Sequence, residues 1–141
     1  MMVLDTHVIS EVMRPQPSPA VLAWLNQQHS PYLFITSISI AEIGYGLRVL
    51  PDGQRRRILQ NRFEQFIVQG FEYRILNFDN LAARVYADIM GVRKEMGYPM
   101  SFPDAQIAAI TRTHNFKLAT RNIKDFESCG IDLINPFDYR L

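Results

Sequence analysis

The chain has 141 residues, of which 48% are hydrophobic and 21% are charged, and its formal net charge is +1. This length is typical of one domain over residues 1–141, and the composition is that of a folded globular protein rather than a disordered chain. The small net charge argues against a protein that coats nucleic acid, although an enzyme with a local positive field is still possible.

Cysteine content and hydropathy exclude further classes. The single cysteine, Cys129, rules out an intrachain disulfide framework and a multi-cysteine zinc site. No apolar run is long enough to span a bilayer, and the N-terminal residues lack a signal-peptide pattern. We therefore expect a cytoplasmic protein with no membrane partner.

Short apolar runs alternate with amphipathic stretches in the first half of the chain. Ser18 and Pro19 are typical of an N-cap followed by proline in the first helical turn. We expect strands over residues 2–6 and 32–36, and helices over 19–28, 37–49 and 54–69. The inward face of the last helix is expected to consist of Ile58, Leu59, Phe63, Phe66 and Ile67.

The second half repeats this alternation. We expect a strand over 71–77 with Tyr73 and Ile75 on one face, then a helix from Asp79 or Asn80 to about residue 96. A helix over 101–114, a strand over 117–120, a short turn or helix over 122–126 and a strand over 131–134 follow. Alternating strands and helices predict an α/β fold with a mainly parallel sheet of four to five strands, covered on both faces. The apolar stripe of the 79–96 helix is expected at Leu81, Val85, Ile89 and Val92.

Asp5 ends the first predicted strand. Ligands of open α/β sheets bind outside the carboxyl ends of the strands, which makes Asp5 a candidate site residue. Asp is also a common helix cap and turn residue. The stretch alone leaves both interpretations open.

Further acidic or amide residues follow predicted strands or begin predicted helices: Glu42, Asp104 and Asn122, with Asp125 close behind. The pairs Ser39–Glu42 and Ser101–Asp104 have capping-box spacing, so capping explains each carboxylate taken singly. If these helices start at one sheet edge, however, the carboxylates converge, repel one another and favour a bound cation. Oxygen ligands select Mg²⁺ or Mn²⁺, which suits attack of a metal-activated water on a phosphodiester.

Four segments, in this order, resemble the signature segments of PIN-domain ribonucleases, in particular the VapC and FitB toxins of bacterial toxin–antitoxin pairs. They are residues 4–10, 39–42, 103–109 and 119–126, and the resemblance covers essentially the whole chain. It implies a PIN-like three-layer α/β/α fold and a Mg²⁺-dependent endoribonuclease, usually a homodimer, that cleaves RNA. It also implies a small VapB- or FitA-like antitoxin that inhibits the enzyme and supplies the only contact with operator DNA.

The resemblance assigns site residues by position. Asp5, Glu42 and Asp104 match the three principal family carboxylates and would bind the metal. His7 stands where the first segment commonly has Asn, and we expect it to be structural or a substrate contact. Asn122 stands where the family often has a fourth acid, so Asp125 is either a substitute ligand or an ordinary surface carboxylate.

Other residues near the expected site have two interpretations each. Thr6 and Thr120 would hydrogen-bond carboxylates or water, or else stabilise turns. Arg121 and Arg14 would contact a phosphate, or else pair with a neighbouring acid or stay solvated. We expect most of the aromatic bulk of four residues to belong to the core, and some of it to form an exposed groove for an antitoxin helix: Trp24, Tyr45, Phe63 and Phe66.

Two alternatives to the ribonuclease toxin stay open. The first is a catalytically impaired PIN-like binding or regulatory partner, which is consistent with Asn122 in place of a fourth acid. The second is a receiver-like signalling domain with an Asp phosphoacceptor, which expects paired acids after the first strand where this chain has only Asp5.

Overall fold

A sheet of five parallel strands runs through the computed structural model, which describes all residues 1–141, in the order β3-β2-β1-β4-β5. Its central strand lies between two neighbours that come much later in the chain, so that Val3 stands opposite both Phe34 and Leu118. The strands are short: β1 (Met2–Leu4), β2 (Leu33–Thr36), β3 (Ile75–Leu76), β4 (Lys117–Ala119) and β5 (Leu133–Ile134).

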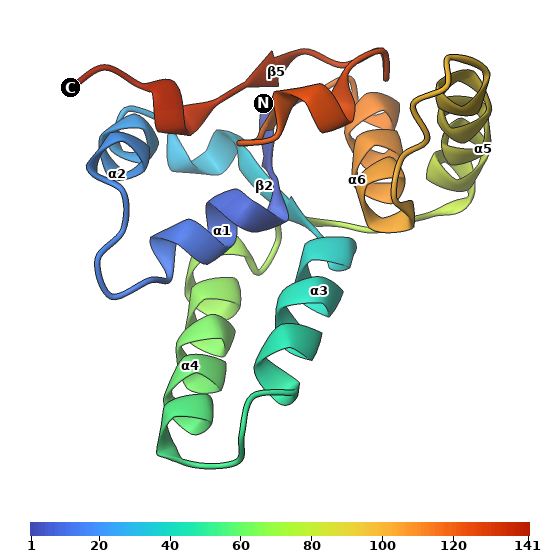
Figure 1. Ribbon diagram of the computed structural model, residues 1–141. Coiled ribbons are helices and arrows are strands. Elements are labelled where there is room, and N and C mark those ends of the chain that lie inside the picture. Colours follow the sequence, from blue (N-terminus) through green and yellow to red (C-terminus); the bar gives the residue numbers. More distant parts are fainter.

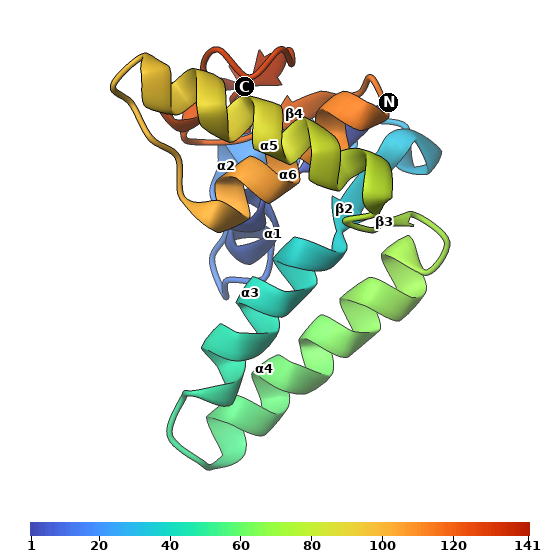
Figure 2. The ribbon, with the colours of Figure 1, turned by 90° about the vertical axis from the view of Figure 1, so that its right-hand side faces the viewer.

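Helices cover both faces of the sheet, as Figures 1 and 2 show. On one face lie α5 (Asn80–Glu95) and α6 (Phe102–Thr113), and on the other lie α1 (Thr6–Val12) and α2 (Pro19–Asn26). Successive residues of β1 serve the two sides, because strand side chains alternate: Val3 packs in the α5–α6 core and Leu4 in the α1–α2 core. The predicted three-layer α/β/α architecture is confirmed.

The helices α3 (Ser37–Arg48) and α4 (Gln54–Gln65) project from the sheet as an antiparallel pair (Figure 1). A π-helical turn, η2 (Phe66–Gly70), continues α4 and returns the chain to the α1–α2 core, where Phe63 and Ile67 are buried. The prediction that Ile58 faces inward is wrong: it lies nearer the projecting end of α4 and is exposed.

Two predicted strand boundaries are also wrong. The first strand stops at Leu4, because Asp5 caps α1 at once. The predicted strand over 71–77 is only Ile75–Leu76, since the Arg74 N–H donates to the Phe71 carbonyl in a turn, and Tyr73 is 92% exposed.

The buried row of α5 differs from the predicted stripe. Ala82, Ile89 and Arg93 are buried, whereas Leu81 is 62% exposed and Val92 also faces solvent. The row at 82, 89 and 93 lies on one helical face, and the small Ala82 side chain belongs to the core that α5 and α6 share. The prediction is therefore confirmed at Ile89 and at Val85, which packs against this core, and is wrong at Leu81 and Val92.

Apart from Asp5, which caps α1, helix capping matches the sequence at three of four places. Ser18, Asp79 and Ser101 are N-caps, and their side chains accept backbone N–H bonds at 3.5, 2.9 and 3.3 Å. The fourth prediction is wrong, because Thr36 rather than Ser39 caps α3. Glu42 therefore lies inside α3 and does not cap it.

Three short 3₁₀ turns complete the chain: η1 (Ser30–Tyr32), η3 (Ile123–Phe126) and η4 (Pro136–Asp138). The last of these packs against α2. None of the helices has the combination of length and apolar character that crossing a membrane requires.

Candidate acidic active site

Asp5 lies at the carboxyl end of the central strand and is only 2% exposed. One carboxylate oxygen, Oδ1, accepts the Thr6 N–H at 2.8 Å, as expected of the N-cap of α1. The other oxygen, Oδ2, accepts the Thr120 hydroxyl at 2.8 Å from the end of β4. The capping interpretation of Asp5 is confirmed, and capping uses only one of its two carboxylate oxygens.

Burial raises the pKa of Asp5 to about 6 from its usual 3.8. The hydrogen bonds from Thr120 and Thr6 act in the opposite direction, and the negative charge of Asp104 adds to the increase. A carboxylate so far from its ordinary pKa costs folding free energy at neutral pH, which is typical of functional sites.

Glu42 reaches the same edge from α3. The Thr6 hydroxyl donates to Glu42 Oε1 at 2.8 Å and lies 2.8 Å from the buried Ser39 hydroxyl. Because Thr6 has a single hydroxyl proton, Ser39 is the donor in the second bond. This relay from Ser39 through Thr6 orients Glu42, so Thr6 is a carboxylate-positioning residue.

Asp104 is half-buried in the first turn of α6, three residues after its cap Ser101. Partial burial raises its pKa, although the hydrogen bond with Ser101 opposes this, and the charges of Asp125 and Glu42 raise it further. The negative charge of Asp104 in turn raises the pKa of Asp5. Four carboxylates from separate parts of the chain therefore share one electrostatic field: Asp5, Glu42, Asp104 and Asp125.

The chemistry of these side chains fits a hard divalent cation. All are oxygen donors, and their mutual repulsion is what a cation would relieve. They do not form a closed ligand set, since no three His, Cys, Asp or Glu side chains are grouped tightly enough to hold an ion. Mg²⁺ needs only one or two carboxylates, because it keeps several waters and takes substrate phosphate oxygens as ligands.

Asn122 joins this centre indirectly. Its backbone N–H donates to Thr120 Oγ1 at 3.0 Å, and Thr120 in turn donates to Asp5. Its side-chain Nδ2 lies 3.2 Å from Nδ1 of the exposed His7. His7 and Asn122, which the sequence resemblance singled out as departures from the signature segments, are therefore partners.

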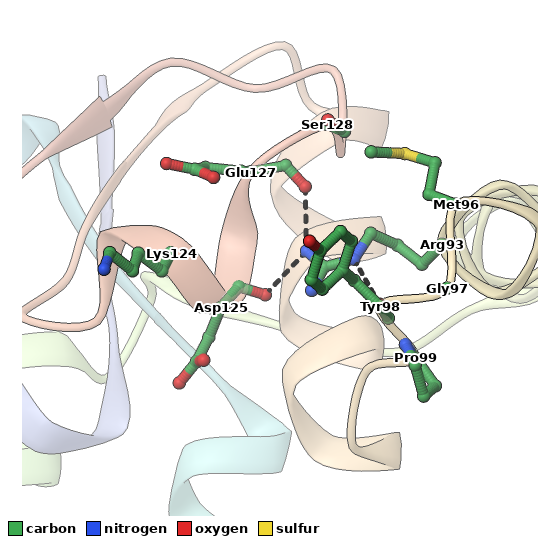
Figure 3. A pocket seen from close by; sticks show the side chains of 9 residues that line it. All are labelled: Arg93, Met96, Gly97, Tyr98, Pro99, Lys124, Asp125, Glu127 and Ser128. Carbon is green, nitrogen blue, oxygen red and sulfur yellow. Dashed lines mark hydrogen bonds between the residues drawn. The ribbon is translucent and has the colours of Figure 1, made fainter.

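Asp125 is exposed on η3 and uses its backbone and side chain differently. Its carbonyl accepts Arg93 Nη1 at 3.0 Å, while its carboxylate points away from Arg93 (Figure 3). The charge of that carboxylate is felt at Asp104. Asp125 thus belongs to the electrostatic surroundings of the acidic centre.

Sequence reasoning missed Arg93, which is 6% exposed in α5. It donates to three backbone carbonyls: Tyr98 at 2.7 Å, Asp125 at 3.0 Å and Glu127 at 2.8 Å (Figure 3). These bonds join α5, the loop before α6 and η3 around a cavity of about 610 Å³. The only available signal was its position on the Ala82–Ile89 face of the helix.

A parallel α/β/α sandwich with carboxylates gathered at the carboxyl edge of its sheet defines the class of protein. A family model described as the PIN domain matches residues 2–130, and the chain belongs to this family, which is a nuclease family. The resemblance inferred from the four sequence segments is confirmed.

Individual relatives match over nearly their whole length. The chain is 43% identical over 138 residues to the VapC ribonuclease Y4jK of Sinorhizobium fredii, covering 98% of this chain and 99% of that protein. It is 36% identical over 137 residues to toxin FitB of Neisseria gonorrhoeae, covering 97% and 99%. The solved structure of FitAB bound to an IR36 DNA fragment superposes with a TM-score of 0.92 and 35% identity, covering 100% of this chain and 99% of that chain.

Proposed function

We propose that this chain is the toxin of a toxin–antitoxin pair and a Mg²⁺-dependent endoribonuclease that hydrolyses RNA phosphodiester bonds. The observation that carries the proposal is the shared field of Asp5, Glu42 and Asp104 at one sheet edge, in a member of a nuclease family. Relatives named a VapC ribonuclease and toxin FitB support the same function.

Asp5, Glu42 and Asp104 would hold Mg²⁺, or Mn²⁺, which has similar ligand preferences. Because the three do not form a closed ligand set, one or two would bind the ion itself and the rest would bind its waters. When bound, the cation supplies charge neutralisation at the phosphate and a lower pKa for water, the nucleophile of the reaction. Thr120 and Thr6 fix the Asp5 carboxylate, and Thr6 also fixes Glu42, so these ligands are oriented in advance. Asn122 would contact the substrate or a water from its place beside Thr120.

The single cysteine, Cys129, does not compete for this role. The buried Cys129 thiol contacts the Met100 sulfur at 3.4 Å and the Glu127 carbonyl at 3.6 Å. Burial raises its pKa, which lowers the thiolate fraction. Cys129 therefore fits a packing role, and attack by water is the simpler mechanism.

The proposed partners follow from the relatives. The solved relatives include a toxin–antitoxin complex from Klebsiella pneumoniae, and FitAB and VapBC bound to DNA. We infer a small antitoxin for this chain, operator DNA contacted only through that antitoxin, a homodimer and a cytoplasmic location. RNA is the inferred substrate.

The test is cleavage of RNA with Mg²⁺ and with chelator. We expect the unsubstituted protein to cleave only with the cation, and Asp5→Asn to lose cleavage because the central carboxylate is removed. Asp132→Asn is the matched control, since Asp132 is exposed beside β5 and makes no ion pair. Undiminished activity of Asp5→Asn would defeat the assignment.

One observation favours a second candidate, a catalytically impaired binding partner: an amide, Asn122, where the family often has an acid. Toxicity on expression without antitoxin, abolished by Asp104→Ala, would exclude it. The receiver-like alternative fits less well, because the observed strand order 3-2-1-4-5 differs from the 2-1-3-4-5 order of receiver domains.

A further inference from the structure

A second polar cavity, of about 440 Å³, opens beside the acidic centre between α1 and the C-terminal segments. Two arginines line it, and we call it the arginine pocket. Its other lining side chains used below are His7, Glu11, Asn122 and Phe137. Its one carboxylate is that of Glu11, so two guanidiniums face a single negative charge.

Arg14 is held on one side of the pocket by an ion pair with the buried Glu11. Its Nη1 donates to both oxygens of Glu11 at 3.0 Å, and the buried Glu11 also accepts the Ser18 N–H at 2.9 Å. The Arg14 side chain is nevertheless 63% exposed, so its other N–H groups stay available to a ligand. The ion pair fixes the guanidinium without using all of its donors.

Arg121 is held on the other side by an aromatic ring. Its guanidinium carbon lies 4.6 Å from the centroid of Phe137, in cation–π geometry. The side chain is exposed and makes no ion pair. Stacking therefore orients Arg121 and leaves its N–H donors free.

Asn122 connects the arginine pocket to the acidic centre. Its side chain lines the pocket with His7, and its backbone N–H reaches Asp5 through the Thr120 hydroxyl. A strand whose scissile phosphate lies at Asp5 would thus continue past Asn122 into the pocket. Because the carboxylates repel an RNA strand, nearby positive groups are needed to bind it.

We propose that the arginine pocket binds a phosphate of the RNA strand that neighbours the scissile phosphate; this rests on the proposed function. Two anchored guanidiniums suit phosphate oxygens, which they contact in bidentate fashion. An acidic segment of a protein partner is the alternative occupant. It is disfavoured because Phe137, the only hydrophobic lining residue, is stacked by Arg121 and leaves no apolar anchor for a peptide.

The experiment measures binding of a short fluorescein-labelled single-stranded RNA by anisotropy, in chelator, across a range of salt concentrations. Each phosphate contact with single-stranded nucleic acid contributes about 0.7 to the slope of log K against log salt. We therefore expect Arg121→Gln and Arg14→Gln each to weaken binding about tenfold and to reduce the slope by about 0.7. The loss should be equal for two RNAs of different sequence, because a phosphate contact carries no sequence information.

Matched variants separate charge from folding. Arg55→Gln removes the same charge at the start of α4, away from the pocket, and should leave the slope unchanged. Arg14→Gln could destabilise the fold, because the buried Glu11 carboxylate loses its arginine partner. Arg121→Gln removes an exposed side chain that makes no ion pair, so its effect on binding can still be interpreted in that case. Phe137→Leu keeps the charge of Arg121 but removes its stacking partner, and should weaken binding by a smaller factor than Arg121→Gln.

Unchanged affinity and slope in both arginine variants would overturn the proposal, as would undetectable RNA binding by the unsubstituted protein. Loss of antitoxin binding with RNA binding intact would assign the pocket to the protein partner instead. These failures are distinct from failure of the proposed function. If Asp5→Asn abolishes cleavage but neither arginine variant changes RNA binding, the phosphate subsite is wrong and the proposed function stands. If both arginine variants weaken RNA binding but the unsubstituted protein never cleaves RNA, the proposed activity is wrong and the phosphate subsite stands.

Discussion

Replacement of Asp5 by Asn should stabilise the metal-free protein while it abolishes cleavage. The folded protein holds the Asp5 proton up to about pH 6, whereas the unfolded chain releases it near the usual pKa of 3.8. The free energy of unfolding therefore falls as the pH rises from about 4 to about 6, and this loss is complete above that range. The neutral Asn side chain has no such loss.

The magnitude follows from the size of this shift. About two pKa units correspond to an upper limit of roughly 3 kcal/mol at neutral pH. Against this, the single oxygen of Asn can accept the Thr6 N–H but not the Thr120 hydroxyl as well, and the loss of one acceptor costs roughly 1–2 kcal/mol. We expect a net gain of about 1–2 kcal/mol for the variant, or a Tm higher by roughly 3–6 °C for a domain of this size.

The assay is thermal or urea unfolding of both proteins in chelator, from about pH 4 to about pH 8. The difference between Asp5→Asn and the unsubstituted protein should grow through the window from pH 4 to 6 and then stay constant. Asp132→Asn, which changes an exposed carboxylate, should show no such pH-dependent difference. A variant that is less stable by the same amount at every pH would refute the reasoning.

Three further predictions concern other ionisable groups. Although burial raises the pKa of Glu11, the Ser18 N–H and Arg14 lower it more, so Glu11→Gln should cost about 2 kcal/mol at pH 7, with the cost disappearing as the pH falls below its usual 4.5; acid unfolding curves measure this. Arg93→Met should lower the free energy of unfolding by about 3 kcal/mol or more, because three carbonyls lose their donor, and Arg93→Lys should recover part of it in urea titrations. In cleavage assays Asp104→Asn should lose more than ~100-fold, since even outer partners of metal ligands cost 10–100-fold, whereas Asp125→Asn should lose clearly less.

Much of the fold was predictable because local signals agreed with the global architecture. The Ser18–Pro19 and Ser101–Pro103 helix starts were read from capping chemistry, and the alternation of strands and helices gave the parallel sheet. The errors arose where tertiary packing decides. Which face of α5 is buried depends on how closely α6 approaches Ala82, and no periodicity within one helix reveals that distance.

The site was predictable in its residues but less so in its contacts. Asp5, Glu42 and Asp104 were identified from their positions after strands and near helix starts, and the structure brings them into one field. The hydrogen bonds of Thr6 with Glu42 and Ser39 could not be predicted, because they depend on how closely α1 approaches α3. Arg93 was missed because arginine is usually exposed, and only a folded chain shows three carbonyls converging on it.

The hydrogen bond between Thr120 and Asp5 joins residues 115 positions apart, across the central pair of strands. During translation Asp5 leaves the ribosome first, and at 5–20 residues per second it waits roughly ten seconds for Thr120. Throughout that interval β1 lacks its β4 neighbour, and the buried carboxylate lacks one of its two donors. A nascent chain that ends before Thr120 therefore lacks both the β4 strand and this donor, so the surroundings of Asp5 are completed only when most of the chain has been made.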